Sequence, residues 1–420
     1  MTQKASEDFS DCRETRQVHR SALSDPRFRR YYPASWFSSL GAWLLRFLLG
    51  WSAWELTHSA TWVGIVGALM LAPALVLSPW FGILSDRINP REGLRFSMVI
   101  HSLIALLGAI TSGFDVYDRA MLVTLASALG VATSLHSPMR LALVPLLVAR
   151  EALPSAVGYS AMSFNIARMV GPAVGAILVA QLTVTTAWMT AMLMFCISFL
   201  GLSRLRIERA SDAERSAPYV QQLMAGFRYL LGRTDLKLLL ALTALNGLLG
   251  RTVIELLPAL SGQLLQGGST ELATLVAMAG LGSVLGGLFV SRQTADLIAL
   301  FRLVCVAIGL ACLGLVALRW FSGTLGLSLW VSCLSIVATI AGTGSQTLVQ
   351  LCAEGDYRGR VMSVWTMFAM GAPALGAALL GAGADRVGFS SVSLLVGGVG
   401  LGLAATCYAR RSAVVGAGSP

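Results

Sequence analysis

Charged side chains are scarce in this sequence. Lys and Arg number 31 and Asp and Glu 21, so charged residues make up 12% of the 420 residues, against roughly 25% in an average soluble domain. Residues 1–32 hold 12 of these charges and residues 204–237 hold 11, which leaves long stretches almost without charge. A soluble enzyme, a nucleic-acid binder or a disordered chain would expose far more charge. The deficit indicates a polytopic membrane protein.

Metal-ligating residues are scarce as well. The sequence has 4 His and 7 Cys, and no two cysteines form a Cys-x-x-Cys pair. Most of the cysteines lie in or beside apolar stretches, where a thiol packs as a small hydrophobe. We therefore expect no disulfide framework, no metal site and no cofactor.

The N-terminal region lacks the apolar run that a cleavable signal peptide needs. Its first 32 residues are polar and rich in Arg, so we expect a cytoplasmic tail there. The formal net charge of +10 does not call for a nucleic-acid partner, because inner-membrane proteins retain Arg and Lys on their cytoplasmic side.

Apolar runs long enough to cross a bilayer, about 20 residues each, recur through the chain. Their number predicts an all-α polytopic membrane protein with twelve transmembrane helices. One long polar stretch, from Arg204 to Asp235, separates six runs from six. The predicted spans are 34–56, 60–84, 94–112, 119–148, 155–181 and 186–203, then 237–262, 271–291, 297–318, 325–351, 361–383 and 390–409.

This division predicts two pseudo-symmetric six-helix bundles. We expect a cytoplasmic tail over 1–32, an N-terminal bundle over 33–203, a cytoplasmic linker over 204–236, a C-terminal bundle over 237–410 and a cytoplasmic tail over 411–420. Parts of the two halves match: Gly82-Ile-Leu-Ser-Asp86-Arg87 ends the second span, and Gly287-Leu-Phe-Val-Ser291-Arg292 ends the eighth. A duplicated membrane unit places its substrate site between the halves, near the bilayer midplane.

The distribution of arginine over the loops predicts the orientation. The loops on one side of the predicted bundle contain only three arginines, Arg119, Arg319 and Arg386. Because Arg and Lys are retained on the cytoplasmic side, we expect a multi-pass protein of the bacterial inner membrane with both termini inside. The arginines on that inner side are Arg87, Arg91, Arg150, Arg204, Arg206, Arg209, Arg215, Arg292, Arg358, Arg360, Arg410 and Arg411.

The loop after the second span carries Gly82-Ile-Leu-Ser-Asp86-Arg87-Ile-Asn-Pro-Arg91. It resembles the signature Gly-x-x-x-Asp-Arg-x-x-x-Arg of the major facilitator superfamily, and with the twelve spans this resemblance covers nearly the whole chain. Three further stretches resemble the branch that includes the enterobactin exporter and related drug and siderophore efflux proteins. These stretches are Pro138-Met-Arg-Leu-Ala-Leu-Val-Pro145, Ser163-Phe-Asn-Ile-Ala-Arg168-Met-Val-Gly-Pro-Ala-Val-Gly175 and Arg358-Gly-Arg-Val-Met-Ser363.

The resemblance implies export of small molecules by alternating access, driven by a proton gradient. It also implies a gating role for Gly82, Asp86, Arg87 and Arg91. The Asp86 carboxylate can bind a neighbouring helix N-terminus or pair with Arg87 or Arg91 while the cytoplasmic side is closed. The second half has Ser291 at the matching position, so this latch is expected on one side only. A solvated loop is the alternative interpretation.

The fifth span carries a partial match to the antiporter motif of drug and siderophore exporters. It comprises Arg168, Gly171, Pro172 and Gly175, while Ser160 and Ala167 occupy positions that are Gly in the longer motif. Proline bends a helix and frees a carbonyl, and two glycines four residues apart let helices touch. A kinked, tightly packed helix accounts for the same residues.

Ionisable and amide groups inside the spans are the candidate substrate site, because such groups are costly in a membrane and usually face a cavity or a partner. In the superfamily that the sequence resembles, the first, fourth, seventh and tenth spans line the central cavity. Arginine predominates over glutamate here, so we expect an anionic, carboxylate- or catecholate-bearing substrate rather than a lipophilic cation. For Arg140 and Arg168 a purely structural role is an equal alternative. The candidates are Arg46, Arg140, Asn246, Arg251, Glu255 and Gln346.

Glu255 is the candidate proton carrier, because a carboxyl group within a span can bind and release a proton during a transport cycle. Arg251 precedes it by four residues and can pair with it on one helix face. We interpret His101 and His136 as hydrogen-bonded structural residues, with a histidine that titrates near pH 7 as the alternative. Trp43 is assigned to lipid or helix contact, with stacking on a ring-bearing substrate as the alternative.

Two other functions compete with export. The same fold can serve uptake or flipping of a metabolite or a lysolipid. A membrane-embedded enzyme would need a constellation such as paired Asp-rich motifs, His-Glu-x-x-His or a buried Ser–His pair, and the sequence shows none. We therefore expect a monomeric transporter whose partners are a small-molecule substrate, protons and the lipid bilayer.

Overall fold

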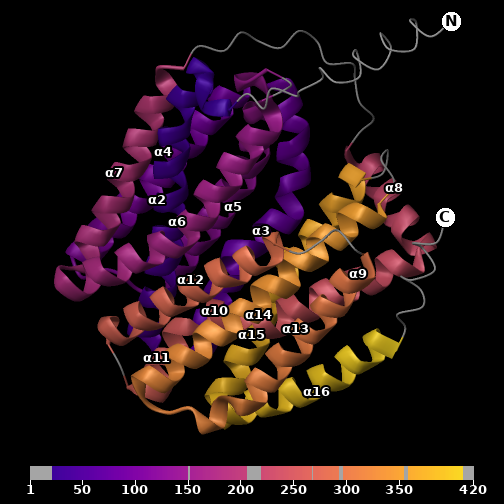
Figure 1. The fold of residues 1–420 in the computed structure, drawn as a ribbon. Coiled ribbons are helices and arrows are strands. Elements are labelled where there is room, and N and C mark those ends of the chain that lie inside the picture. Colours follow the sequence, from indigo (N-terminus) through magenta and orange to yellow (C-terminus); the bar gives the residue numbers. More distant parts are fainter. Residues whose placement is uncertain are drawn as a thin grey trace, which may run out of the picture.

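The computed structural model describes residues 21–149, 152–205, 219–266, 268–292, 297–353 and 358–409. Every regular element within these ranges is a helix. We call α2–α7 the first half and α9–α16 the second half (Figure 1). The helices of the first half are α2 (Pro26–Thr57), α3 (Ala60–Arg87), α4 (Pro90–Gly113), α5 (Arg119–Leu143, continued by η2, Val144–Leu147), α6 (Leu153–Gln181) and α7 (Val184–Ser203), preceded by η1 (Ala22–Ser24).

The second half follows the amphipathic helix α8 (Tyr219–Gly232), which lies in the segment expected as a linker. The helices of the second half are α9 (Thr234–Asn246), η4 (Gly247–Arg251), α10 (Thr252–Glu255), α11 (Leu257–Leu265), α12 (Ser269–Ser291), α13 (Leu297–Ala317, continued by η5, Leu318–Trp320), α14 (Gly323–Cys352), α15 (Arg358–Val387) and α16 (Phe389–Ala409). The seventh predicted span is divided among the first four of these elements, α9 to α11.

Helix α2 begins well before the first predicted span. The side chain of Asp25 accepts a hydrogen bond of 2.9 Å from the backbone N–H of Arg27, and Pro26 occupies the first helical position. An acidic N-cap followed by proline is a strong helix start, because it satisfies one of the free N–H groups and pre-sets the backbone. The helix therefore includes residues 26–32, which hydropathy assigns to the polar tail.

Ten helices or helix runs in the described part of the chain are long and apolar enough to cross a membrane. Helices α2 and α3 are not among them, although α3 contains the shorter apolar stretch Ala60–Ala74. The polytopic all-α fold is therefore confirmed, and twelve crossings stay a prediction for α2 and α3. The sides of the helices expose large apolar residues such as Trp80, Leu141 and Leu395, as expected for surfaces in contact with lipid.

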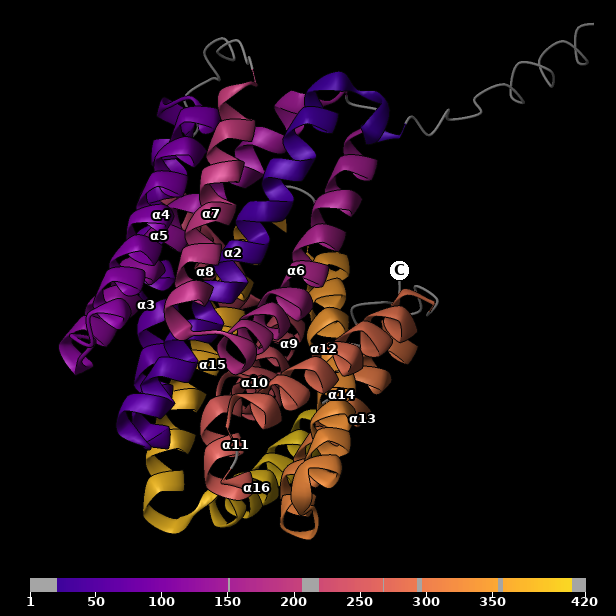
Figure 2. The ribbon, with the colours of Figure 1, turned by 90° about the vertical axis from the view of Figure 1, so that its left-hand side faces the viewer.

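The halves contact each other along two helix pairs, α3 with α15 and α6 with α12 (Figures 1 and 2). Glycines bring these helices together. A Cβ atom on Gly64 of α3 would collide with the carbonyl oxygen of Ala377, and one on Gly280 of α12 would collide with the Met169 side chain of α6. Small residues allow such close packing, which drives helix association in membranes.

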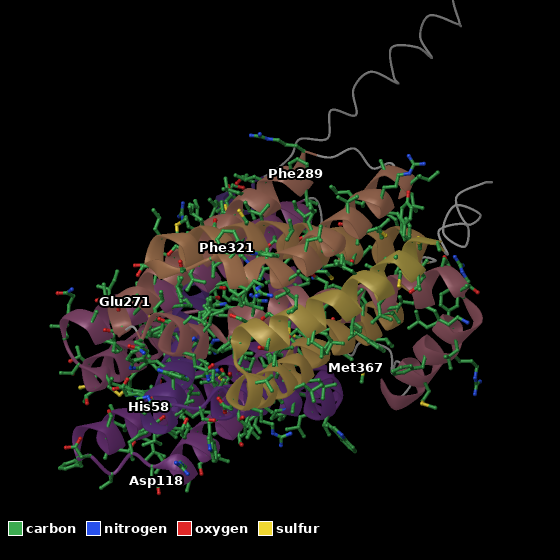
Figure 3. The ribbon with its side chains drawn as sticks, turned by 90° about the horizontal axis from the view of Figure 1, so that it is seen from below. His58, Asp118, Glu271, Phe289, Phe321 and Met367 are labelled. Atoms are coloured by element: carbon green, nitrogen blue, oxygen red, sulfur yellow. The ribbon has the colours of Figure 1, made fainter. Side chains whose placement is uncertain are left out.

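The end of the bundle at which α2 ends and α3 begins is called the distal end below, and the end at which α2 begins is called the proximal end. The distal end contains the connections that follow α2, α4, α6, α11 and α13, and the end of α15. Figure 3 labels His58, Asp118, Glu271 and Phe321 from these connections and the helix starts beside them, and all four lie in the left-hand half of the view.

Candidate functional site

A π turn interrupts the seventh predicted span at the residues expected to bind substrate. Helix α9 ends at Asn246, and Gly247–Arg251 form the π turn. Such turns are rare and occur frequently at functional sites. The Thr252 hydroxyl donates to the Gly247 carbonyl over 2.9 Å, which holds the turn. Gly247 leaves room for α15, since a Cβ there would lie 2.8 Å from that of Ala372.

Beyond this turn, Glu255 forms an ion pair with Arg46 of the first half. One oxygen of the Glu255 carboxylate lies 3.2 Å from a guanidinium nitrogen of Arg46, and the other lies 3.4 Å from the same nitrogen. The side chains are only 15% and 17% exposed, respectively. The pair therefore joins α10 to α2 in a partly dehydrated position between the halves, where opposite charges interact strongly.

The sequence suggests a pair between Arg251 and Glu255, four residues apart on one helix face. The ion pair in the described chain instead joins Glu255 to Arg46, and Arg251 is a member of none of the ion pairs found there. The π turn ends at Arg251, and α-helical residues lead from it to Glu255. The Glu255 carboxylate takes its partner from the opposite half rather than from its own helix.

Two further arginines act on this pair electrostatically. Arg251 is half-buried and lies within electrostatic range of Glu255 and Arg46. Arg168 of α6 is also half-buried and lies within range of Arg251 and Glu255. We call Arg46, Arg168, Arg251 and Glu255 the charge cluster. It contains three guanidinium groups and one carboxylate. A surplus of positive charge that is partly withdrawn from water is costly unless it is compensated.

Two aromatic rings connect the charge cluster to Arg140. The Arg46 guanidinium lies 5.0 Å from the ring centroid of Trp43. The Trp43 ring packs edge-on against Phe164, with centroids 5.8 Å apart, and the Arg140 guanidinium lies 5.1 Å from the Phe164 ring. Distances below about 6 Å are attractive cation–π contacts. The two rings therefore lie between two cations, and Trp43 contacts a neighbouring helix, which is one of the two uses that the sequence predicts for it.

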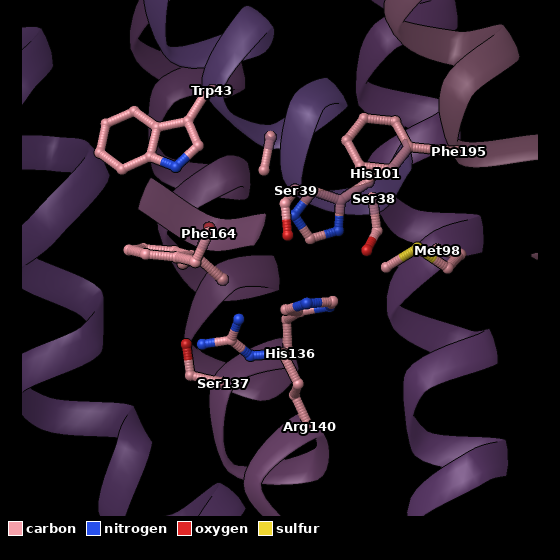
Figure 4. A pocket seen from close by; sticks show the side chains of 12 residues that line it. Ser38, Ser39, Trp43, Met98, His101, His136, Ser137, Arg140, Phe164 and Phe195 are labelled. Atoms are coloured by element: carbon pink, nitrogen blue, oxygen red, sulfur yellow. The ribbon is translucent and has the colours of Figure 1, made fainter. Parts of the chain in front are cut away.

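A cavity of about 60 Å³ opens beside these rings, inside the first half (Figure 4). Trp43 and Phe164 form one wall, and His101 and Phe195 lie opposite, with the Arg140 guanidinium between Ser137 and His136 (Figure 4). The space holds a few water molecules or one small functional group. The remaining lining residues are Ser38, Ser39, Ala42, Met98 and Thr133.

The two histidines of this cavity share one serine. His101 Nδ1 lies 2.7 Å from the carbonyl oxygen of Ser97, and because a carbonyl only accepts, this nitrogen carries the proton. The Ser97 hydroxyl is 3.3 Å from His101 Nδ1 and 3.4 Å from His136 Nδ1. The histidines are thus hydrogen-bonded, as the sequence interpretation expects, and they also line the cavity beside Arg140.

The amide candidates of the second half, Asn246 and Gln346, take no part in the Arg46–Glu255 ion pair. Asn246 is buried, and its side-chain nitrogen donates to the carbonyl oxygen of Ala338 on α14 over 3.2 Å. Its side-chain oxygen has no hydrogen-bond partner in the described chain. Gln346 is half-buried on the same helix α14. The roles of both residues in substrate binding stay predictions.

The proposed gating residues are described only in part. The side chains of Gly82, Asp86 and Arg87 lie outside the described residues. Arg91 donates to the carbonyl oxygens of Leu202 and Ser203 at the end of α7, over 2.9 and 2.7 Å, and to Glu92 over 2.7 Å. Its guanidinium therefore satisfies the free carbonyls that end a helix. This contact stays within the first half.

The antiporter-like motif packs α6 against α2. A Cβ on Gly171 would lie 2.7 Å from that of Trp43, and one on Gly175 would lie 2.5 Å from a ring carbon of Phe47. Pro172 lies inside the same helix. The motif thereby sets the position of the Trp43 ring. Phe164 was missed by sequence reasoning, although it precedes Arg168 by one helical turn and so shares its face.

Nearly the whole chain matches one protein family. Residues 19–415 match the model of the transmembrane secretion effector, a family of the major facilitator superfamily. The chain belongs to this family.

Individual relatives match over most of their length. The chain is 23% identical to the staphyloferrin A transporter of Staphylococcus aureus over 370 residues, which cover 87% of this chain and 92% of that protein. It is 27% identical to the enterobactin exporter EntS of Salmonella typhimurium, with 90% of each covered, and 25% identical to macrolide efflux protein A of Streptococcus pyogenes, with 84% and 88% covered.

Solved structures share the fold. A mutant of the nucleoside transporter NupG matches with a TM-score of 0.73 at 13% identity, covering 91% of this chain and 99% of that one. A POT family transporter in complex with 5-aminolevulinic acid matches with a TM-score of 0.72 at 12% identity, covering 93% and 97%. The family match and the relatives together identify the protein as a multi-pass membrane transporter of small molecules.

Proposed function

We propose that the protein exports a small, amphiphilic and anionic molecule of siderophore or drug type by alternating access, in exchange for protons. The observation that carries this proposal is the Arg46–Glu255 ion pair, which joins the halves within a cluster that has a surplus of arginine. Similarity to proteins named as a staphyloferrin A transporter, an enterobactin exporter and a macrolide efflux protein supports export of small molecules.

The proposal includes a place and an orientation. The protein lies in the bacterial inner membrane with both termini in the cytoplasm, so that the proximal end faces the cytoplasm and the distal end faces outward. Two six-helix bundles, 33–203 and 237–410, move against each other. The excess of arginine in the loops of the proximal side supports this orientation.

The ion pair determines when the halves can change conformation, and so how substrate is exchanged for protons. A substrate anion that binds Arg46 displaces the Glu255 carboxylate, and a proton that binds Glu255 removes its charge. Either event breaks the contact between the halves, whereas the empty, unprotonated protein keeps it. The halves therefore change conformation when they carry a substrate or a proton, which is the condition for antiport.

The aromatic rings define a second part of the proposed substrate. Trp43 and Phe164 offer ring surfaces between Arg46 and Arg140. A molecule with an anionic group and an apolar ring fits this arrangement, because the arginines attract the charge and the rings stack on the apolar part.

Transport by purified protein in liposomes tests the choice of anion. We would compare carboxyfluorescein, an anionic ring-bearing dye, with rhodamine 123, a lipophilic cation of similar size. We expect transport of the anion only, and at least tenfold slower transport by Arg46→Gln and by Arg251→Gln. The control is Arg95→Gln, which removes an arginine that pairs with Glu92 outside the cluster. Unchanged transport by both cluster variants would refute the anion proposal.

Proton coupling needs a separate measurement. Glu255→Gln cannot exchange a proton, so we expect it to move the anion down its own gradient without acidifying the liposome interior. The control is Glu271→Gln, since Glu271 hydrogen-bonds the Gly268 N–H at a helix start. Full proton coupling in Glu255→Gln would place the proton elsewhere and leave the substrate proposal intact.

The direction of flux separates export from its alternative. Inside-out vesicles that express the protein should accumulate the anionic dye when their interior is acidified. Accumulation by right-side-out cells, or movement of a labelled lysolipid between leaflets, would instead favour uptake or flipping.

A further inference from the structure

Asp385, near the end of α15, binds the start of α3 in the opposite half. Its carboxylate accepts hydrogen bonds from the backbone N–H groups of Ala60 (2.8 Å) and Thr61 (2.9 Å) and from the Ser59 hydroxyl (2.5 Å). It also accepts one from the side-chain amide of Gln263 on α11, over 3.0 Å. One carboxylate thus connects three helix ends at the distal end of the bundle.

The chemistry of a helix start explains this contact. The first N–H groups of an α-helix have no partner within the helix and carry partial positive charge, so a carboxylate stabilises them. For α3 this carboxylate comes from the other half. Ser59 provides a local cap as well, because its hydroxyl oxygen accepts from the Trp62 N–H over 3.3 Å. If the halves separate, Ser59 still holds one N–H and water reaches the others. Loss of the Asp385 contact therefore leaves none of these N–H groups without a hydrogen-bond partner, so the contact can form and break during a transport cycle.

Close backbone packing surrounds the carboxylate. A Cβ on Gly381 of α15 would collide with the carbonyl oxygen of Ala60, and one on Gly262 of α11 would collide with the Trp54 ring of α2. These two glycines bring α15 and α11 of the second half directly against the first half. The distal end is thus closed in this structure, and Asp385 lies at its rim, exposed to solvent.

The sequence around Asp385 repeats a motif seen elsewhere in the chain. Gly381-Ala-Gly-Ala-Asp385-Arg386 has the spacing Gly-x-x-x-Asp-Arg of Gly82-Ile-Leu-Ser-Asp86-Arg87. Helices α3 and α15 pack antiparallel, since Ala60 meets Gly381 while Gly67 meets Ala377. The two copies therefore lie at opposite ends of one helix pair. In Gly287–Arg292 of the second half, Ser291 occupies the position that corresponds to Asp86. In Gly381–Arg386 on α15, that position is occupied by the carboxylate of Asp385.

We propose that Gly381-Ala-Gly-Ala-Asp385-Arg386 repeats the first six positions of the signature motif, with Ser390 in place of its final Arg, and that Asp385 is the latch of the distal gate. In the closed state Asp385 caps α3 from the opposite half. Opening of the distal end breaks this cap, and closing restores it. The latch does not depend on which molecule is transported.

Distances between spin labels on the two halves test the latch without any substrate. Labels at Val116 in the first half and Phe321 in the second would report opening of the distal end, because both side chains are exposed there. The seven native cysteines would first be replaced by alanine. We expect Asp385→Ala to raise the ratio of open to closed protein about tenfold, which corresponds to ~1.4 kcal/mol. Asp385→Asn keeps an acceptor oxygen and should give a smaller rise.

Asp118 provides the matched control. Its carboxylate also caps a helix at the distal end, accepting from the Met121 N–H over 2.8 Å, but both residues belong to the first half. Asp118→Ala should therefore leave the ratio unchanged. An unchanged distribution in Asp385→Ala, or an equal rise in Asp118→Ala, would overturn the proposal.

A disulfide supplies a second test with folded protein. Ser59→Cys combined with Asp385→Cys should, when oxidised, abolish the open distance component, and reduction should restore it. Ser112→Cys with Thr185→Cys is the control, because these hydroxyls lie 3.1 Å apart at the distal end within the first half. Persistence of the open component in the oxidised Ser59→Cys, Asp385→Cys protein would contradict the latch.

Discussion

The Arg46 guanidinium and the Glu255 carboxylate lie 3.2 Å apart, although their residues are separated by 209 positions and belong to different halves of the chain. Removal of one partner leaves the other charge without compensation in a partly buried position, which is destabilising. Removal of both leaves no such charge. The pair therefore links the stability of the protein to the contact between its halves.

A double-mutant cycle measures this link. We expect Arg46→Gln and Glu255→Gln each to lower the free energy of unfolding in detergent, and the double variant to lose less than the sum of the two. The coupling energy should be about 1–3 kcal/mol, the range for residues in direct contact. Additive losses would show that the two side chains do not interact.

Trp43 provides a test of the aromatic part of the site. Replacement by Leu removes the ring that lies 5.0 Å from the Arg46 guanidinium and packs on Phe164. We expect carboxyfluorescein to bind about 5- to 30-fold more weakly, because a ring contact of this kind contributes roughly 1–2 kcal/mol. Fluorescence polarisation of the dye would measure the affinity.

Trp80→Leu is the control for that measurement. Trp80 is 66% exposed on the side of α3, so its loss should leave dye affinity unchanged. Equal effects of the two substitutions would assign Trp43 to general packing.

Hydropathy and glycine spacing predict the helices of this protein well, because a bilayer requires long apolar runs and glycines mark helix contacts. The partner of Glu255 was not predictable in this way. Arg251 is its neighbour in sequence, but the partner is Arg46, which lies 209 positions away on a helix of the other half. No local pattern contains that contact. The same applies to Asp385, whose partners at Ser59–Thr61 are 324 to 326 positions away.

The close contact of α3 with α15 predicts that a larger residue at Gly64 destabilises the protein. A methyl group there collides with the Ala377 carbonyl oxygen, and backbone cannot move aside as a flexible side chain does. We expect Gly64→Ala to cost about 1–3 kcal/mol of unfolding free energy, the usual range for overpacking, and to open the distal end. Thermal unfolding and the Val116–Phe321 label distance would report the two effects.

Gly67→Ala is the matched control on the same helix. A Cβ at Gly67 would lie 3.9 Å from that of Ala377, an ordinary contact distance. Alanine also favours the helix over glycine by roughly 0.5–1 kcal/mol. We therefore expect Gly67→Ala to be neutral or stabilising. A loss equal to that of Gly64→Ala would mean that close packing at Gly64 is not the cause.

The charge of the proposed substrate predicts how membrane potential acts on transport. Export of one negative charge in exchange for one inward proton moves two charges in the direction that an inside-negative potential favours. Each charge gains about 2.3 kcal/mol per 100 mV, so the two together gain ~4.6 kcal/mol. Liposomes with the protein and a fixed pH gradient, in which valinomycin and potassium set the potential, would measure carboxyfluorescein movement. We expect the rate to rise as the compartment of origin is made more negative. An exchange that moves no net charge would proceed independently of the potential, so a rate independent of potential would contradict the proposed exchange of an anion for a proton.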